Sequence, residues 1–244
     1  MIQETITYTC NSCGSVNIIK NGTNKCGNPQ YHCKDCGVYR VLKPKYGYSS
    51  ETKEQILHAY RERMSLRGVE RVFQVSRQTV MGWLEEKVRH LPHLSETLLP
   101  AQADDVLELD EAWSFVYKKK HKRWLWTALC RRTRQIVAFV IGDRSEASCR
   151  RLWKAIPDNY RHCQSYSDFW DAYQKVFDSD THQSVGKESG ETAHQERWYN
   201  TLRQWLGRFT RKTLSFSKSD YHHHLVTQWF ITEYNLTKSL SLTI

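Results

Sequence analysis

The chain has 244 residues, of which 39% are hydrophobic, and a formal net charge of +10 at pH 7. This length leaves room for one large domain or two to three small ones, and the composition is that of a globular protein with a sizeable core. The absence of an apolar run of about 18 residues and of a signal-peptide pattern predicts a soluble protein that stays in the cytoplasm. The basic charge and the many aromatic residues favour a polyanionic partner, most commonly nucleic acid, although some basic proteins never touch DNA.

Cysteines concentrate near the N-terminus, where the pattern CxxCG occurs twice. Zinc prefers four soft ligands in a tetrahedron, and CxxC lets two thiolates from one tight turn reach the same ion. Without a secretion signal, metal ligation is favoured over disulfides, and a redox CxxC would normally occur once. The sequence therefore predicts a structural Zn²⁺ in a zinc ribbon over residues 1–47, with Cys26 or His32 as alternatives for one ligand. The predicted ligands are Cys10, Cys13, Cys33 and Cys36.

Three short amphipathic helices are expected over residues 48–92. Ser76 is a good N-cap for the third helix, which would place Val80 and Leu84 inward and its first turns outward. A helix-turn-helix domain presents its recognition helix to base edges in this way, and the alternative is a plain three-helix bundle for protein contacts. The predicted DNA-binding residues on this helix are Arg77, Gln78 and Met81. Residues 93–104 contain little periodicity and predict a linker.

The pattern changes to β-strands after residue 105. Three segments rich in β-branched and aromatic residues predict consecutive antiparallel strands. These segments are 106–117, 123–130 and 135–141. On the first, Asp110 lies opposite the row of bulky side chains, together with small residues, so it is expected to face a site with room in it. Glu108 shares that row and Glu111 interrupts the bulky one, so spacing alone leaves both as rivals of Asp110.

Two further carboxylates follow along the chain. A short predicted strand leads to Asp168, which therefore stands where a strand meets a helix, the usual place for a side chain presented to substrate. Asp171 is better explained as the dipole partner at the start of the next helix. After a loop, residues 192–209 are predicted to form one amphipathic helix, with an apolar face for the core and Glu196 on the opposite face.

The order of these strands, helices and carboxylates resembles the ribonuclease-H-like fold of the DDE transposases and integrases. The residues around each carboxylate make the resemblance more specific: LDEAW at 109–113, SDFWDAY at 167–173, and ERxxNxLRQ at 196–204 followed by RKTLSFSKS at 211–219. In these motifs the chain resembles the transposases typified by insertion sequence one, which also carry a zinc knuckle and a helix-turn-helix. The resemblance implies a multidomain protein whose α/β ribonuclease-H-like catalytic domain, residues 105–244, is built on a mixed five-stranded sheet.

The resemblance also implies a transposase that binds terminal inverted repeats and catalyses DNA 3′-end cleavage and strand transfer. Such phosphoryl transfer uses two divalent ions about 3.5–4 Å apart, and carboxylates are the ligands that Mg²⁺ (or Mn²⁺) requires. Asp110 is expected to bridge the two ions, with Asp168 and Glu196 each completing one coordination sphere. The alternatives are a DNA-binding regulator with an inactive catalytic domain and a metal-dependent nuclease that only hydrolyses.

The polar face of the helix over residues 192–209 is expected to meet double-stranded DNA. Arg197, Asn200 and Arg203 are predicted to contact its backbone, and the alternative is a surface polar network. On the same helical wheel Gly207 lies on the side of Glu196 and is expected to keep the approach of the DNA open. Because two element ends must be brought together, the protein is expected to act as a homodimer or larger assembly.

Overall fold

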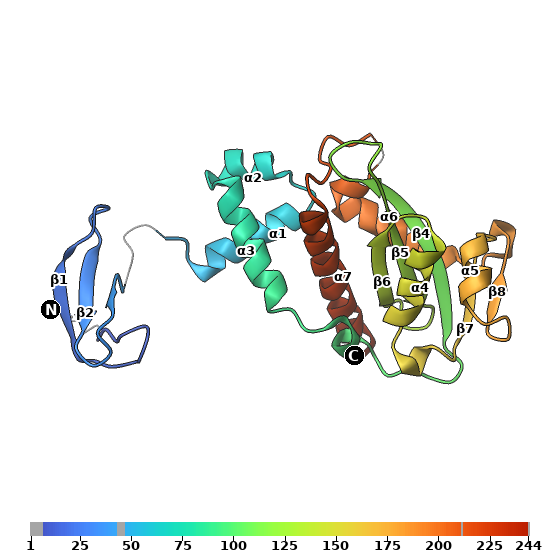
Figure 1. Ribbon diagram of the computed structural model, residues 1–244, viewed down its shortest axis with the longest axis horizontal. Coiled ribbons are helices and arrows are strands. Elements are labelled where there is room, and N and C mark those ends of the chain that lie inside the picture. Colours follow the sequence, from blue (N-terminus) through green and yellow to red (C-terminus); the bar gives the residue numbers. More distant parts are fainter. Residues whose placement is uncertain (1–6, 43–46, 211, 244) are drawn as a thin grey trace. The chain divides into compact units, whose positions relative to one another are not determined.

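The computed structural model describes residues 7–42, 47–210 and 212–243. Contacts divide the chain into two compact units, Met1–Lys53 and Glu54–Ile244, whose elements are drawn in Figure 1. Residues 43–46, just before the boundary expected between residues 47 and 48, lie outside the described residues. Within the described part of the chain, every helix is too short or too polar to cross a membrane.

A small antiparallel sheet forms the N-terminal unit. Its strands are β1 Ile18–Thr23, β2 Pro29–Cys33 and β3 Tyr39–Arg40, paired in the order β1-β2-β3. Each CxxCG turn closes through a hydrogen bond that the glycine N–H donates to the carbonyl of the first cysteine, at 2.8 Å for Gly14 and 2.9 Å for Gly37. Both glycines have positive φ, 74° and 73°, a conformation that residues with a Cβ rarely adopt.

Three helices open the second unit along the chain: α1 Ser50–Arg61, α2 Leu66–Phe73 and α3 Arg77–Arg89. The hydroxyl of Ser65 accepts the N–H of Gly68 and caps α2, and that of Ser76 accepts the N–H of Thr79 and caps α3. These caps satisfy amide groups that have no partner within the helix, which explains why both helices begin where they do. A 3-10 helix, η1 Leu94–Thr97, lies in the connection to the sheet.

A mixed five-stranded sheet lies at the centre of the second unit, as the resemblance implied. Its strands are β4 Val106–Phe115, β5 Lys122–Cys130, β6 Ile136–Gly142, β7 Gln164–Ser167 and β8 His182–Ser184. The spatial order is β6-β5-β4-β7-β8. The first three strands are antiparallel to one another, whereas β7 pairs with β4 in parallel and β8 pairs with β7 in parallel. The expected run of three antiparallel strands is therefore confirmed.

Helices cover both faces of this sheet (Figure 1). One face packs against α4 Glu146–Ala155 and α5 Asp171–Val176, and the other against α6 Ala193–Trp205 and α7 Asp220–Thr243. Strand β5 alternates accordingly: Trp126 belongs to the hydrophobic cluster under α4 and α5, whereas Leu125 belongs to the cluster under α6 and α7. The remaining 3-10 helices are η2 Asp158–Tyr160, η3 Lys187–Ser189 and η4 Gly207–Phe209.

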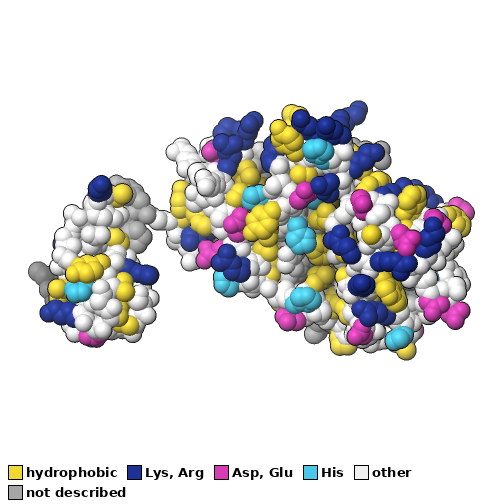
Figure 2. All heavy atoms as spheres, in the orientation of Figure 1, with side chains coloured by type: hydrophobic (Ala, Val, Ile, Leu, Met, Phe, Trp, Pro, Cys, Tyr) yellow, Lys and Arg dark blue, Asp and Glu magenta, His cyan; other side chains and the backbone are white. Residues whose placement is uncertain are grey.

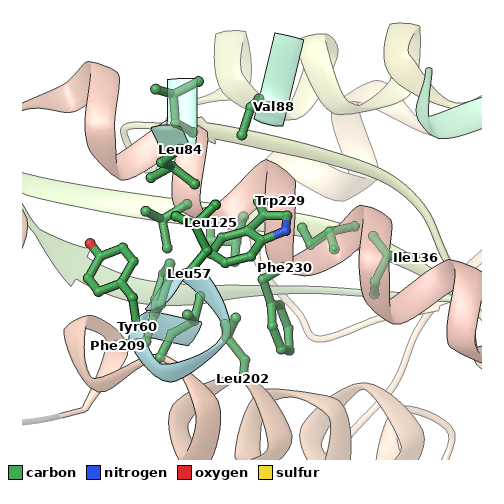
Figure 3. Packing of buried hydrophobic residues seen from close by; sticks show 14 of the residues in the cluster. Leu57, Tyr60, Leu84, Val88, Leu125, Ile136, Leu202, Phe209, Trp229 and Phe230 are labelled. Carbon is green, nitrogen blue, oxygen red and sulfur yellow. The ribbon is translucent and has the colours of Figure 1, made fainter. Parts of the chain in front are cut away.

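The second hydrophobic cluster also joins α1 and α3 to the sheet through α7. Figure 3 shows Leu57 of α1 and Leu84 of α3 beside Trp229 of α7 and Leu125 of β5. Each of these side chains is at most 2% exposed, and burial of one such side chain stabilises a fold by ~1.5–3 kcal/mol. The three helices and the sheet therefore share one core, and apart from the first turn of α1 they belong to one compact unit.

Two local expectations were wrong. Strand β8 lies in a segment expected to be a loop; its sequence, His-Gln-Ser, is too short to give an alternating signal, and it forms only through pairing with β7. The helix expected over residues 192–209 ends at Trp205, because Leu206 has extended backbone angles and the 3-10 turn η4 begins at Gly207. Leu206 and Phe209 are buried as expected, but from outside the helix.

Candidate active site and metal centre

Strand β4 carries three acidic residues in different surroundings. Glu108 and Glu111 are buried, with 0% and 8% of their surface exposed, whereas Asp110 is half-buried at the edge of a cleft. Buried carboxylates need hydrogen-bonding or charged partners, and the structure supplies them to both glutamates. The contacts of these three side chains therefore separate the rivals that spacing alone left open.

Glu108 caps helix α6. Its Oε2 accepts the backbone N–H groups of His194 at 3.0 Å and Gln195 at 2.9 Å, and its Oε1 accepts Nε of Arg131 at 2.9 Å. A carboxylate at the first amides of a helix satisfies donors that lack partners and interacts favourably with the helix dipole. Glu108 therefore holds the first turn of α6 against β4, and Glu196 belongs to that turn.

Glu111 is engaged on the opposite face of the sheet. Its Oε1 accepts Nε of Arg144 at 2.6 Å, and its Oε2 accepts the hydroxyl of Tyr173 at 2.9 Å. The guanidinium of Arg144 lies between two indole rings, 4.7 Å from the centre of Trp124 and 4.1 Å from that of Trp170. Both oxygens of Glu111 are thus occupied by protein donors.

The three carboxylates singled out from the sequence line one cleft of about 720 Å³. Asp110 comes from β4, Asp168 follows the end of β7, and Glu196 lies in the first turn of α6. Oδ1 of Asp168 accepts the N–H of Trp170 at 3.0 Å, which orients its side chain, and Nη2 of Arg144 lies 4.0 Å from Oδ2. The fold therefore brings together residues from three separate elements.

The cleft is electrostatically strained without a cation. Burial and the negative charges of Glu111, Asp168 and Glu196 together raise the pKa of Asp110 from 3.8 to about 7, against the hydrogen bond from the N–H of Glu111. A divalent cation would remove this repulsion, because it favours the ionised carboxylates. Hard oxygen ligands are also the donors that Mg²⁺ and Mn²⁺ prefer.

The carboxylates of the cleft are spaced more widely than the ligands of a single ion. Among the described residues, the four N-terminal cysteines are the only group of three or more His, Cys, Asp or Glu residues whose ligand atoms all lie within 4.8 Å of one another. Octahedral Mg²⁺ with ligands at 2.0–2.1 Å keeps its ligand atoms within about 4.2 Å of one another, so three carboxylates at this spacing do not close around one ion. Two ions about 3.5–4 Å apart span a wider set of ligands.

Basic and aromatic side chains complete the cleft. Lys122, Arg144, Lys187 and Arg203 line it together with the carboxylates. No periodic signal marks Arg144 in the sequence, because it is a single arginine between a strand and a helix. Its position between Trp124 and Trp170 becomes visible only when β5, β6 and α5 are brought together.

The polar face of α6 lies beside this cleft. Arg197 and Asn200 are exposed, and Arg203 lines the cleft with its Nη1 3.4 Å from Oδ1 of Asn200. On the buried side, the hydroxyl of Tyr199 donates to the backbone carbonyl of Asp110 at 2.8 Å. Gly207 was expected on this face but lies beyond the end of the helix, where a Cβ would meet Cγ of Arg63 at 3.4 Å.

The N-terminal cysteines form a second candidate metal centre. Sγ of Cys10 lies 3.6 Å from that of Cys36, and Sγ of Cys13 lies 3.6 Å from that of Cys33. Zn–S bonds of about 2.3 Å in a tetrahedron place the sulfurs about 3.8 Å apart, so this cluster fits zinc. Within the described residues Cys26 and His32 lie outside the cluster, and the ring of His32 stacks on Tyr39.

The predicted DNA-binding residues of α3 have unequal exposure. Arg77 and Gln78 are exposed, and Nε of Arg77 lies 3.0 Å from a carboxylate oxygen of Glu70. Met81 was expected to point outward, but it is half-buried and packs against the core. Its apolar side chain covers part of the cluster that joins α3 to α7.

Comparison with known proteins places this cleft in a family. Residues 105–236, which include all three cleft carboxylates, match the IS1 transposase family. The chain is 36% identical over 129 residues to the insertion element iso-IS1n protein InsB of Shigella dysenteriae, an alignment that covers 53% of this chain and 95% of that protein. It is also 36% identical over 119 residues to the IS1 protein InsB of Shigella flexneri, covering 49% of this chain and 88% of that protein.

These matches define the class of the protein as a transposase of an insertion element, and hence a DNA-processing enzyme in general. The chain belongs to the IS1 transposase family. The family match covers the sheet, α4 to α6 and most of α7, and it begins after the three N-terminal helices.

Proposed function

We propose that the chain binds the terminal inverted repeats of its element and catalyses metal-dependent DNA 3′-end cleavage and strand transfer. The observation that carries this proposal is the convergence of Asp110, Asp168 and Glu196 on one cleft in a chain of the IS1 transposase family. Carboxylates from three elements can hold divalent ions while leaving positions for phosphate and water. The proposed cofactor is Mg²⁺ or Mn²⁺.

The proposed catalytic fold is ribonuclease-H-like. In its support, the sheet places the third, second, first, fourth and fifth strands of the domain side by side, with the first three antiparallel and the last two parallel to the first. Helices on both faces make the sheet a buried scaffold that holds side chains in fixed positions. The proposed catalytic domain is residues 105–244, after a linker at 93–104.

Each cleft residue has a proposed role. Asp110, at the centre, is proposed as the shared ligand of two ions, with Asp168 and Glu196 as ligands of one ion each. When bound, the ions would activate the attacking oxygen and stabilise the leaving oxygen of an in-line displacement. The exposed side chains of Arg197 and Asn200, and Arg203 in the cleft, are proposed to contact the DNA backbone and hold the phosphate near the carboxylates.

The N-terminal part is proposed to recognise the element ends. Residues 48–92 would act as a helix-turn-helix with α3 as the recognition helix, since its first turn exposes Arg77 and Gln78. Met81 offers only its half-exposed side to DNA. Residues 1–47 would form a zinc ribbon on the four clustered cysteines. Because two ends must be joined, a homodimer or larger assembly is proposed on double-stranded DNA.

A joining assay tests this function. The purified chain is incubated with a labelled duplex that carries the inverted repeat flanking its coding sequence, with target plasmid and Mg²⁺. The proposal predicts end-labelled products joined to plasmid. Nicks without joined products would instead indicate a hydrolytic nuclease, and retardation of the duplex without cleavage would indicate a DNA-binding regulator.

A further inference from the structure

A second cavity, distinct from the catalytic cleft, lies between α2 and the segment that follows α6. This groove of about 350 Å³ is lined by the α1–α2 connection, the exposed side of α2, the start of α3 and parts of residues 205–218. Its cationic lining residues are Arg63, Arg67, Arg71, Arg77, Arg208 and Lys218. The lining residues that the structure describes include no carboxylate, and of the six cations only Arg77 has an ion pair there, with Glu70 beside the groove.

Four of these cations have contacts within the protein: Arg77 pairs with Glu70, Lys218 lies over the ring of Phe216, and Arg208 and Arg63 brace the groove. Nη2 of Arg208 donates to the hydroxyl of Tyr60 at 2.5 Å and Nη1 to the hydroxyl of Ser217 at 2.9 Å, which ties the segment after α6 to α1. Arg63 reaches Thr210 at 3.5 Å across the same gap.

Arg67 and Arg71 supply free charge at the groove. Both are exposed, and neither is in an ion pair within the part of the chain that the structure describes. They are separated by one helical turn of α2, so their side chains project on one face about 6 Å apart. Such a row of unpaired guanidinium groups is suited to successive phosphates, which arginine binds through two N–H donors at once.

The groove lies next to both proposed DNA contacts. The turn η4 separates it from the catalytic cleft, because Phe209 lines the cleft whereas Gly207 and Arg208 line the groove. At its other end Arg77 belongs to the first turn of α3. Figure 2 shows Lys and Arg side chains gathered along the edge of this unit where α2 and the β4–β5 connection lie in Figure 1.

We propose that this groove binds the sugar–phosphate backbone of the element end between the recognition helix and the catalytic cleft. The inference rests on the proposed function and adds the path of the duplex to it. The groove carries no sequence-reading role, because phosphate contacts position a protein on DNA without specifying bases. It explains why α1 to α3 share a core with the catalytic sheet: a rigid connection sets the distance from the bound repeat to the cleaved phosphate.

The double variant R67Q/R71Q tests this inference, with R150Q/K154Q on α4 as the charge-matched control. Binding to the inverted-repeat duplex and to an unrelated duplex is measured by fluorescence anisotropy over a range of salt concentrations. The expected result is an affinity loss on the order of tenfold for both duplexes, and a decrease of about 2 in the slope of log K against log salt. R67K/R71K should retain most of the affinity, and the control variant should bind like the parent chain.

Unchanged affinity and salt slope in R67Q/R71Q, with normal binding by the parent chain, would overturn the groove assignment and leave the proposed function standing. Binding to a polyglutamate peptide is measured in parallel. If R67Q/R71Q binds DNA like the parent chain but loses the parent's binding to this peptide, the groove is assigned to an acidic protein partner and the proposal is overturned as well. If the parent chain binds neither duplex, the proposed function itself fails and the groove assignment with it. Thermal unfolding of each variant confirms that the fold is retained.

Discussion

Oε2 of Glu108 accepts the backbone N–H of Gln195 at 2.9 Å. A buried carboxylate on β4 therefore caps α6 at the residue that precedes Glu196. This contact couples the position of one cleft carboxylate to the strand that carries another. Asp110 lies two residues after Glu108, on the same face of β4. The relative placement of Asp110 and Glu196 therefore depends on a side chain that does not line the cleft.

Replacement of Glu108 with Ala should reduce stability and joining together. The variant leaves Nε of Arg131 and the first amides of α6 without their acceptor, at a cost of about 3 kcal/mol. Glu108→Gln keeps one acceptor and should lose less. Urea unfolding and the joining rate measure both effects. Glu191→Gln is the matched control, because Glu191 pairs with the same arginine from a more exposed position and should cost less than ~1 kcal/mol. Normal stability of Glu108→Ala would contradict the capping role.

Replacement of Asp110 with Asn should stabilise the fold above neutral pH when no divalent ion is added. The folded state raises the pKa of Asp110 from 3.8 to about 7, so it binds a proton more tightly than the unfolded state does. The ionised side chain therefore destabilises the fold above about pH 7, by at most about 4 kcal/mol, and this destabilisation is lost as the pH falls through 7 toward 4. Unfolding free energies of both proteins at about pH 5 and about pH 8.5 measure the effect; equal stabilities at the higher pH would disprove it.

Replacement of Arg144 should destabilise the fold, because its guanidinium is the charged partner of the buried carboxylate of Glu111. Arg144→Ala leaves a buried carboxylate without its cation and two indoles without the guanidinium between them, which should cost about 2 kcal/mol after allowance for the partial exposure of the arginine. Arg144→Lys keeps the charge but loses the planar stacking. A double-mutant cycle with Glu111→Gln, measured by thermal unfolding, should give a coupling free energy between the two side chains on the order of 1 kcal/mol. Additive effects would show that the two side chains act independently.

Zinc should bind the N-terminal cysteines, and its removal should not affect the second unit. The N–H groups of Ser12 and Cys13 lower the pKa of Cys10, whereas, against the N–H of Ser15, the sulfurs of Cys36 and Cys33 raise the pKa of Cys13, so a cation is needed to hold all four as thiolates. Elemental analysis should find zinc in the parent chain and in Cys26→Ser, and none in a Cys10→Ser/Cys33→Ser variant. That variant should bind element ends more weakly and retain the unfolding transition of the second unit. Unchanged end binding would argue against a role of the ribbon in recognition.

The sequence predicted the elements that carry strong local signals. Leu66–Phe73 and Arg77–Arg89 are two of the three helices expected over residues 48–92, because each has a serine cap at its start and an apolar face. The row of bulky residues on β4 also predicted correctly which side of the strand Asp110 occupies. The recurrence of CxxCG predicted which cysteines cluster.

The remaining features depend on contacts between distant segments. The capping of α6 by Glu108 joins residues far apart in the chain, and the position of Arg144 requires β5 and α5 to meet. The apolar residues Leu206 and Phe209 continue the helical pattern while the backbone leaves the helix at Leu206. Local periodicity identifies buried residues here but does not determine the backbone that buries them.

The central claim is that Asp110, Asp168 and Glu196 act together in strand transfer. Its most direct test is the joining assay with each residue replaced by Ala, beside Asp171→Ala as the control, since Asp171 lies close to Asp168 but forms an exposed ion pair with Lys175 on α5. All three cleft variants should lose joining while they still bind the inverted-repeat duplex, and Asp171→Ala should join normally. Strand transfer at the parental rate by Glu196→Ala would contradict the account.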